Sequence, residues 1–297
     1  MGTSQSSGGP GPGVPMVPPW TPPAPPPEPP ASEPAAPAHS PPALPAGDDP
    51  PVAPASPNPA VPLFQPALAA PALAPAGRFR GTRRSLGDYA RSGNRDDLKR
   101  ALGHYVRSGY SGSATAAARL GGTATTAQSL GSALSNVANG QPAAGSPLDP
   151  ALLAGRSIQE VMDAVVEAVR PTDGTQDAEA ARAAIRDALS ELLTQYPEAD
   201  LLNLDSDQRE FVIERYAAID VFRRFELDVG VAINEKSPTA TVALARLKDA
   251  RDYVKEIVGA EFRKLRDVGK RLTVDRINRV VSEAVRETCI VFEGYAE

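Results

Sequence analysis

The sequence predicts an all-α protein: a helical bundle of about five long helices, preceded by a small arginine-rich helical region and a long, disordered, proline-rich N-terminal tail. Two observations predict this. Between residues 157 and 297, apolar residues recur at spacings of three and four, and no segment alternates as a strand does. In contrast, 26 of the 32 prolines lie between Pro10 and Pro75. These patterns divide the chain into a tail (1–77), an arginine-rich short-helix region (78–140), a linker (141–156) and the bundle (157–297).

The tail is so rich in proline, alanine and glycine that it cannot bury enough apolar surface to offset the entropy of ordering. Its tryptophan, Trp20, lies between prolines and is predicted to dock on a partner; alternatively, it is an incidental residue in a spacer. Gly2 is small, so we expect Met1 to be removed, which leaves a glycine α-amine. The same start fits the pattern for N-myristoylation, and a start without function is the third alternative.

The arginine-rich region contains an internal repeat, because residues 86–93 match residues 102–109 at six of eight positions. Each unit ends in Ser-Gly, which predicts a short helix closed by a glycine in the left-handed conformation. Asn94 is predicted to cap the second helix, and two aspartates follow in its first turn. Residues 112–139 are mostly small and predict one or two weak helices that add little to a core.

Charge is segregated along the chain. Residues 78–119 hold ten Lys and Arg against three acids, whereas residues 156–297 hold 21 against 28. Basic side chains interleaved with aromatic ones suit a phosphate backbone or stacked bases. Alternatively, the arginines contact an acidic surface, either of a partner or of the bundle itself. The residues predicted to make this partner or nucleic-acid contact are Arg83, Arg84, Tyr89, Arg91, Tyr105 and Arg107.

The bundle helices carry recognisable start signals. Residues 157–160 have the pattern of a capping box, and Asp205, with Gln208 three residues on, is predicted to cap a longer helix. A Ser-Pro pair at 237–238 predicts a further start, because proline suits the first position of a helix. Thr273 is predicted to open the last helix, and a helix over 177–196 ends before a proline.

The search for catalytic residues gives no candidate. The sequence has no Walker A or G-x-G-x-x-G motif, no H-E-x-x-H and no Cys-x-x-Cys. His104 occupies a repeat position where the other unit has an aspartate, and Cys289 borders an apolar stripe, so a structural role is predicted for both. We therefore expect no enzyme activity, no metal site and no cofactor. No apolar run approaches the length that a membrane-spanning helix needs, so we expect a cytoplasmic protein without a membrane contact.

Several long strings in the chain resemble the QatB family. They are residues 1–7, 14–20, 83–93, 102–109, 121–124 and 146–155, together with the later helices. The resemblance implies a subunit of a bacterial anti-phage defence system. It also implies three partners: an ATPase (QatA-type), a QueC-like enzyme (QatC-type) and a TatD-like nuclease (QatD-type). No enzymatic motif is attributed to QatB in that family.

The resemblance further implies a chemistry for the N-terminus. QueC-type enzymes use ATP to activate the carboxylate of a deazaguanine and condense it with ammonia. We expect the Gly2 amine to replace ammonia, with Thr3, Ser4 and Gln5 recognised by hydrogen bonding. The tail, residues 1–77, would reach on the order of 200 Å at about 3.1 Å per residue. The chain is then a scaffold that is itself a substrate; the alternative is a nucleic-acid-binding adaptor that recruits the nuclease.

Overall fold

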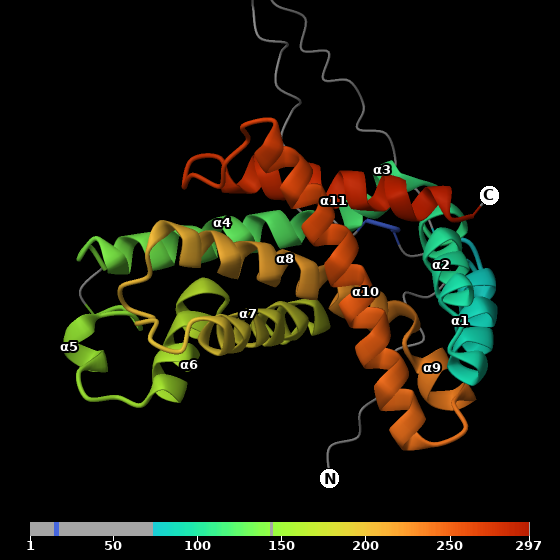
Figure 1. Cartoon of the computed structure of the whole chain (residues 1–297), viewed down its shortest axis with the longest axis horizontal. Coiled ribbons are helices and arrows are strands. Elements are labelled where there is room, and N and C mark those ends of the chain that lie inside the picture. The colour runs from blue at the N-terminus through green and yellow to red at the C-terminus, as the bar shows by residue number, and fades with distance from the viewer. Residues whose placement is uncertain (1–14, 18–73, 143–144, 297) are drawn as a thin grey trace, which may run out of the picture. The chain divides into compact units, whose positions relative to one another are not determined.

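The computed structural model describes residues 15–17, 74–142 and 145–296, and in these the fold is all-α, as predicted (Figure 1). The helices, with the labels of Figure 1, are α1 (Arg80–Ser92), α2 (Arg95–His104), the π-helical turn η1 (Tyr105–Gly109), α3 (Ser113–Arg119), α4 (Gly121–Ala138), α5 (Pro150–Leu153), α6 (Ile158–Val169), α7 (Gln176–Gln195), α8 (Ser206–Val229), α9 (Val231–Lys236), α10 (Ala240–Asp267) and α11 (Ile277–Gly294).

Helix α8 is the central element of this fold. It packs against α4, α7 and α10, while α11 packs against α3, α4 and α10. Helices α1 and α2 form a hairpin whose first helix lies against α9 (Figure 1). One continuous apolar cluster runs from Leu86 through Leu130 and Val212 to Phe292. The arginine-rich region and the bundle therefore share a single core.

Three of the predicted caps are confirmed. The Asn94 side chain accepts a hydrogen bond from the backbone N–H of Asp96 and opens α2. Ser157 and Asp205 open α6 and α8, each in a complete capping box. Such a cap typically stabilises its helix by about 1 kcal/mol, because it satisfies backbone N–H groups that the helix leaves unpaired.

Two predicted helix starts are wrong. Helix α10 begins after Thr239, whose hydroxyl accepts from the N–H of Val242, and not at the Ser-Pro pair just before it. Helix α11 begins at Ile277, because Thr273 instead opens a turn in which its carbonyl accepts from the N–H of Arg276 at 2.8 Å. In both cases the helix begins a few residues later than the side chain that the sequence offers as a cap.

Helix α4 contributes more to the core than its composition predicts. Leu130 and Leu134 are at most 2 % exposed, and α4 packs against α6, α8 and α11. The small residues of α4 permit this close approach: a Cβ on Gly131 would collide with the side chain of Ile277. Two helices, α3 and α4, form over 112–139 as predicted. The expectation that they add little to a core is wrong, because small side chains let helices approach closely.

The chain ahead of the helices also touches the core. Met16 is 6 % exposed and belongs to the apolar cluster, and Pro15 and Val17 are half-buried. Full burial of a methionine side chain stabilises a fold by about 1.5–3 kcal/mol. Figure 1 draws this segment as a short blue arrow. The prediction of disorder throughout residues 1–77 is therefore wrong at Met16, and most of that range lies outside the described residues.

The predicted linker over 141–156 contains structure where it is described. It includes α5, which Asp149 caps by accepting from the N–H of Ala151, and it buries Leu148 and Leu153. Within the described part of the chain, no helix combines the length and the apolar character that crossing a membrane requires.

Candidate interaction surfaces

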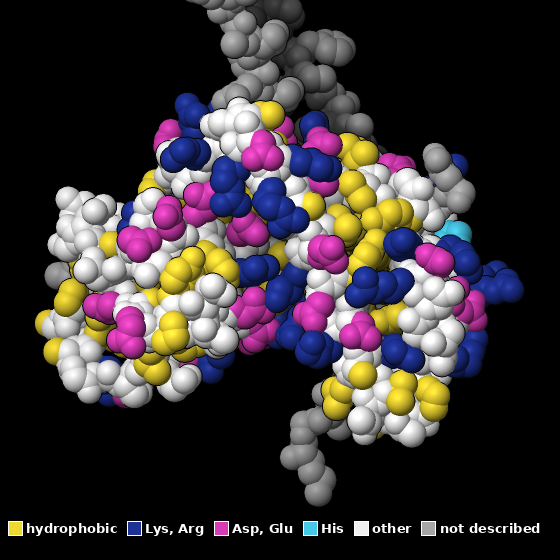
Figure 2. Space-filling view, in the orientation of Figure 1, with side chains coloured by type: hydrophobic (Ala, Val, Ile, Leu, Met, Phe, Trp, Pro, Cys, Tyr) yellow, Lys and Arg dark blue, Asp and Glu magenta, His cyan; other side chains and the backbone are white. Residues whose placement is uncertain are grey.

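The arginines predicted as contact residues lie on the α1–α2 hairpin and the turn that follows it. Arg84, Arg91 and Arg107 are exposed, whereas Arg83 is half-buried. Figure 2 shows Lys and Arg side chains along this edge with acidic side chains between them. Within the hairpin, ion pairs join Arg91 to Asp88 (2.6 Å), Lys99 to Asp96 (3.7 Å) and Arg100 to Asp97 (3.1 Å). The hairpin is therefore a surface of mixed charge with a basic excess.

The tyrosines of the repeat do not lie on this surface. Tyr89 is 1 % exposed and Tyr105 is 4 % exposed. The Tyr89 hydroxyl donates to the backbone carbonyl of Arg246 at 3.0 Å, and the Tyr105 hydroxyl donates to Asp228 at 2.9 Å. Neither ring is available to stack on a base. The prediction that Tyr89 and Tyr105 contact a partner or nucleic acid is therefore wrong, and only the arginines lie at the surface.

Tyr105 belongs to a buried aromatic cluster around Asp228. Tyr110 donates to the same carboxylate at 2.6 Å. The Tyr105 ring stacks on Phe79 at 5.6 Å and meets Phe225 edge-on at 5.0 Å. Burial and then the nearby Asp228 charge hold the pKa values of Tyr105 and Tyr110 well above the ordinary tyrosine value. Both hydroxyls therefore remain protonated donors at neutral pH.

A second buried network joins the basic region to the acidic one. Arg119 donates to both carboxylate oxygens of Asp177, at 2.7 and 2.9 Å. Arg224 pairs with Asp177 and with Asp220, each at 3.0 Å, and the Thr123 hydroxyl donates to Asp220 at 2.6 Å. Burial raises the pKa of Asp177, but the hydrogen bonds and positive charge of both arginines outweigh it, and the net pKa shift is downward. Arg119 is thus an arginine of the basic region that does meet the bundle of the same chain.

Arg78 occupies an unusual environment beside the aromatic cluster around Asp228. It is 7 % exposed, and its guanidinium carbon lies 4.4 Å from the centroid of the Phe79 ring and 4.7 Å from that of Tyr110. None of its three side-chain nitrogens makes a hydrogen bond in the described structure. Attraction to the two ring faces offsets part of the cost of burying this charge.

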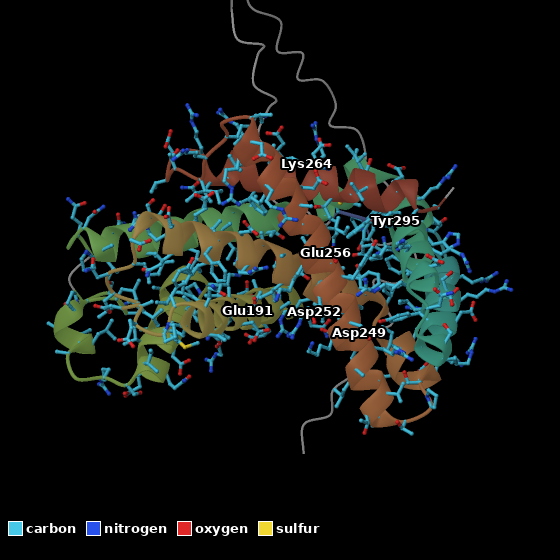
Figure 3. The ribbon with its side chains drawn as sticks, in the orientation of Figure 1. Glu191, Asp249, Asp252, Glu256, Lys264 and Tyr295 are labelled. Atoms are coloured by element: carbon cyan, nitrogen blue, oxygen red, sulfur yellow. The ribbon has the colours of Figure 1, made fainter. Side chains whose placement is uncertain are left out.

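The residues after α11 contact both α2 and α10, since Ala296 lies against Gly103 of α2. The Tyr295 hydroxyl is 2.9 Å from that of Tyr253 on α10, and Figure 3 shows Tyr295 at the end of α11, with Asp249, Asp252 and Glu256 along α10. Lys248 pairs with Asp252 at 2.9 Å, so the acidic side chains of α10 are partly neutralised by its own bases.

A cleft of about 400 Å³ opens at the start of α8. Tyr196 and Phe211 meet edge-on there at 5.7 Å, and Arg266 pairs with Glu214 at 3.1 Å. Burial raises the pKa of Glu214 despite three nearby arginines. The residues that line the cleft are Tyr196, Asp207, Glu210, Phe211, Glu214, Arg266 and Arg271.

Cys289 and His104 both pack against other residues of the fold. Cys289 is 1 % exposed in the core, and burial raises the pKa of its thiol to about 12, so it is an unreactive thiol at neutral pH. His104 is half-buried, and its ring lies against Gly81 of α1. In the described ranges, no group of three His, Cys, Asp or Glu is placed to hold a metal ion. The predicted N-terminal site, Gly2, Thr3, Ser4 and Gln5, and the predicted docking residue Trp20 lie outside the described residues.

Residues 111–292 match the model of a protein family described as Qat anti-phage system associated protein QatB. The chain belongs to the QatB family. The match begins just before α3 and ends within α11, so it covers the core helices and leaves out the tail and the α1–α2 hairpin. Membership confirms the resemblance seen in the sequence and makes the chain a component of an anti-phage defence system. Searches of curated proteins and of solved structures find no match.

Proposed function

We propose that the chain is a non-catalytic interaction subunit of the Qat system whose N-terminal glycine accepts a deazaguanine acyl group from a QueC-like partner enzyme. One observation carries this proposal: the N-terminal arm, residues 2–15, leads to Met16, which is buried in the core of the helical body, residues 74–296. The helical body is then the part that binds the partner proteins, and the arm is the part that is presented to an active site.

The chemistry suits a glycine amine. An α-amine has a pKa of about 8, so a useful fraction is neutral at pH 7, whereas a lysine near 10.4 is almost fully protonated. The tail, residues 1–77, contains no lysine that would compete. The partner would use ATP to convert the deazaguanine carboxylate to an acyl adenylate, and pyrophosphate leaves. The amine nitrogen attacks the acyl carbon, the C–N bond forms, the C–O bond to AMP breaks, and the amine loses one proton to solvent.

The arginines of the α1–α2 hairpin are proposed as the contact surface for a partner protein. Arg84, Arg91 and Arg107 are exposed, while the tyrosines between them face the core. Acidic side chains within the hairpin give it the mixed charge that suits a protein partner better than a continuous phosphate backbone.

The test is the intact mass of the chain, purified after co-expression with and without the QueC-like partner. We expect an increase equal to the deazaguanine acid less one water, located on the N-terminal peptide. Gly2→Pro is the control, because proline also permits removal of Met1 but gives a hindered secondary amine. An unmodified N-terminal peptide from cells that carry the complete, active system would overturn the proposal.

The alternative function, a nucleic-acid-binding adaptor for the TatD-like nuclease, rests on the same arginines. Reversing Arg84, Arg91 and Arg107 to Glu separates the two. If DNA affinity falls steeply with salt in the wild type and is lost in the triple variant, the adaptor function is supported. If only binding to a partner protein is lost, the arginines form a protein contact.

A further inference from the structure

We infer that Met16 is a positioning residue: it fastens the N-terminal arm to the helical body and thereby sets the region that the Gly2 amine can reach. The inference rests on the proposed function, because it concerns the delivery of the same amine. This role differs from the docking predicted for Trp20, which is on a partner, because Met16 binds the core of its own chain.

The first step is the burial of Met16. Its side chain is 6 % exposed and belongs to the cluster that forms the core of the helices. Its neighbours Pro15 and Val17 are half-buried, so the contact is concentrated in one side chain. Methionine is unbranched and adapts its shape to irregular gaps, so its side chain can fill a gap in the core from a short segment of chain.

The second step is the position of the next attachment. Ala74, which is 4 % exposed, also belongs to the core cluster and leads into α1. If Met16 did not hold the chain, the first attachment among the described residues would be at Ala74. Along the sequence, Gly2 is far closer to Met16 than to Ala74.

The third step converts these lengths into reach and local concentration. The segment from Gly2 to Met16 spans at most about 50 Å, whereas the segment from Gly2 to Ala74 spans at most about 250 Å. The effective concentration of a tethered group at a fixed site falls roughly as the −3/2 power of the length of its tether. The roughly fivefold difference in length therefore corresponds to a change of about tenfold in the concentration of the amine at a docked partner. The reach of about 200 Å expected from the sequence becomes about 50 Å, so the partner's active site must lie within that distance of Met16.

The main experiment measures the initial rate of conjugation for full-length variants with the purified QueC-like partner, ATP and the deazaguanine acid. We expect Met16→Asp, which cannot be buried, to lower the rate about tenfold. Met16→Leu, which keeps an apolar plug of similar size, should stay within about twofold of the wild type. Thermal unfolding should show the helices folded at the assay temperature in all three, with a lower midpoint for Met16→Asp because it loses the buried methionine. A Met16→Asp variant that conjugates at the wild-type rate would overturn the inference.

Changing the length of the arm separates an anchor from a purely structural residue, because only an anchor makes the conjugation rate depend on that length. A flexible Gly/Ser segment as long as the stretch from Thr3 to Met16, inserted between Gly8 and Gly9, doubles the anchored arm and should lower the wild-type rate about threefold. The same insertion in Met16→Asp lengthens the longer arm by only about a fifth and should change the rate by less than about 1.5-fold. Equal effects of the insertion in both backgrounds would show that Met16 does not set the arm's length.

A third measurement tests the anchor without any conjugation. The chain has three methionines, Met1, Met16 and Met162, so removal of Met1 leaves two signals in a spectrum of ¹³C-methyl methionine. Met16→Leu identifies the Met16 signal, which we expect at a shifted position with the relaxation of a buried methyl group. A narrow signal at the position of an exposed methionine would overturn the anchor. A buried signal in a chain that is never conjugated would leave the anchor standing and refute the proposed function instead.

Discussion

The two repeat units, residues 86–93 and 102–109, share six of eight residues and yet end in different structures. The first unit closes α1 at Gly93, which has the predicted left-handed conformation with φ of 72°. The second unit continues into the π-helical turn η1, and Gly109 lies against the ring of Phe79 instead of closing a helix. The glycine prediction is therefore confirmed for the first unit and wrong for the second.

The two units also differ in what their matched tyrosines and two of their matched glycines contact. Tyr89 donates to a backbone carbonyl of α10, and Tyr105 donates to the Asp228 carboxylate. Gly87 faces the flexible side chain of Lys236, and Gly103 faces the backbone of Ala296. The shared residues thus specify which positions are buried and which are tightly packed, while the surrounding helices decide what each position contacts.

The largest expected effect comes from removing the partner that only the second unit has. Asp228→Ala leaves the hydroxyls of Tyr105 and Tyr110 in a buried site without their acceptor. An unsatisfied buried hydroxyl costs about 1–3 kcal/mol, so we expect the free energy of unfolding in urea to fall by about 3–4 kcal/mol. Asp249→Ala is the matched control, because that carboxylate is 58 % exposed and lies 3.9 Å from Arg246. Equal losses in the two variants would contradict the buried cluster.

The second prediction compares the two tyrosines directly. Tyr105→Phe removes a hydrogen bond to a carboxylate, for which we expect a loss of about 2 kcal/mol. Tyr89→Phe removes a hydrogen bond to a backbone carbonyl, for which we expect about 1 kcal/mol. Urea unfolding of both variants measures the difference. A larger loss at Tyr89 would mean that the two units contribute to the core in the reverse order.

The third prediction compares the two glycines. A Cβ on Gly103 would lie 2.5 Å from the backbone nitrogen of Ala296, so Gly103→Ala must displace the end of the chain at a cost of about 1–2 kcal/mol. A Cβ on Gly87 would lie 3.3 Å from the Lys236 side chain, which can move, so Gly87→Ala should be nearly neutral or slightly stabilising.

Thermal unfolding measures this glycine pair, and a truncation sharpens it. Deleting residues 295–297 removes the backbone that a Cβ on Gly103 would strike. In that shortened chain we expect Gly103→Ala to cost no more than Gly87→Ala. A persistent loss would show that Gly103 is required for a contact within the helices and not for the seat of the chain end.

The repeat also shows how far the sequence predicts this molecule. Apolar periodicity and capping residues predict the long helices, because both are local properties of the chain, and the caps at Asn94, Ser157 and Asp205 are confirmed. What the sequence does not predict is non-local. The acceptor of Tyr105 lies 123 residues away, and the contribution of α4 depends on how closely small residues let other helices approach.

The candidate site follows the same rule. Composition predicts an arm without a core of its own, but a single methionine among prolines carries no periodic signal, so the anchor at Met16 was missed. The alternation of Tyr and Arg in the repeat was visible in the sequence. The sequence did not show which of these side chains are buried, because the tyrosines are turned inward by the packing of α1 against α9 and of η1 near Asp228.

The last effect is expected at alkaline pH, where the two tyrosines should differ again. Burial, with a smaller contribution from Asp249, raises the pKa of Tyr89 to about 12. A tyrosine whose folded pKa is raised contributes stability that is complete below its unfolded pKa of about 10. Above that pH the unfolded chain releases the proton and the folded one does not, so the free energy of unfolding falls as pH rises towards 12.

In Tyr89→Phe the fall in the free energy of unfolding should be shallower between pH 10 and 12. In Tyr105→Phe it should be shallower over a wider pH range, because the pKa of Tyr105 lies well above its ordinary value. Urea unfolding between pH 9 and 12 measures the slopes. The raised pKa of Cys289 acts in the same direction from about pH 9, so all variants should carry Cys289→Ala. A slope for Tyr89→Phe that equals that of the parent would mean that the Tyr89 hydroxyl is not buried in solution.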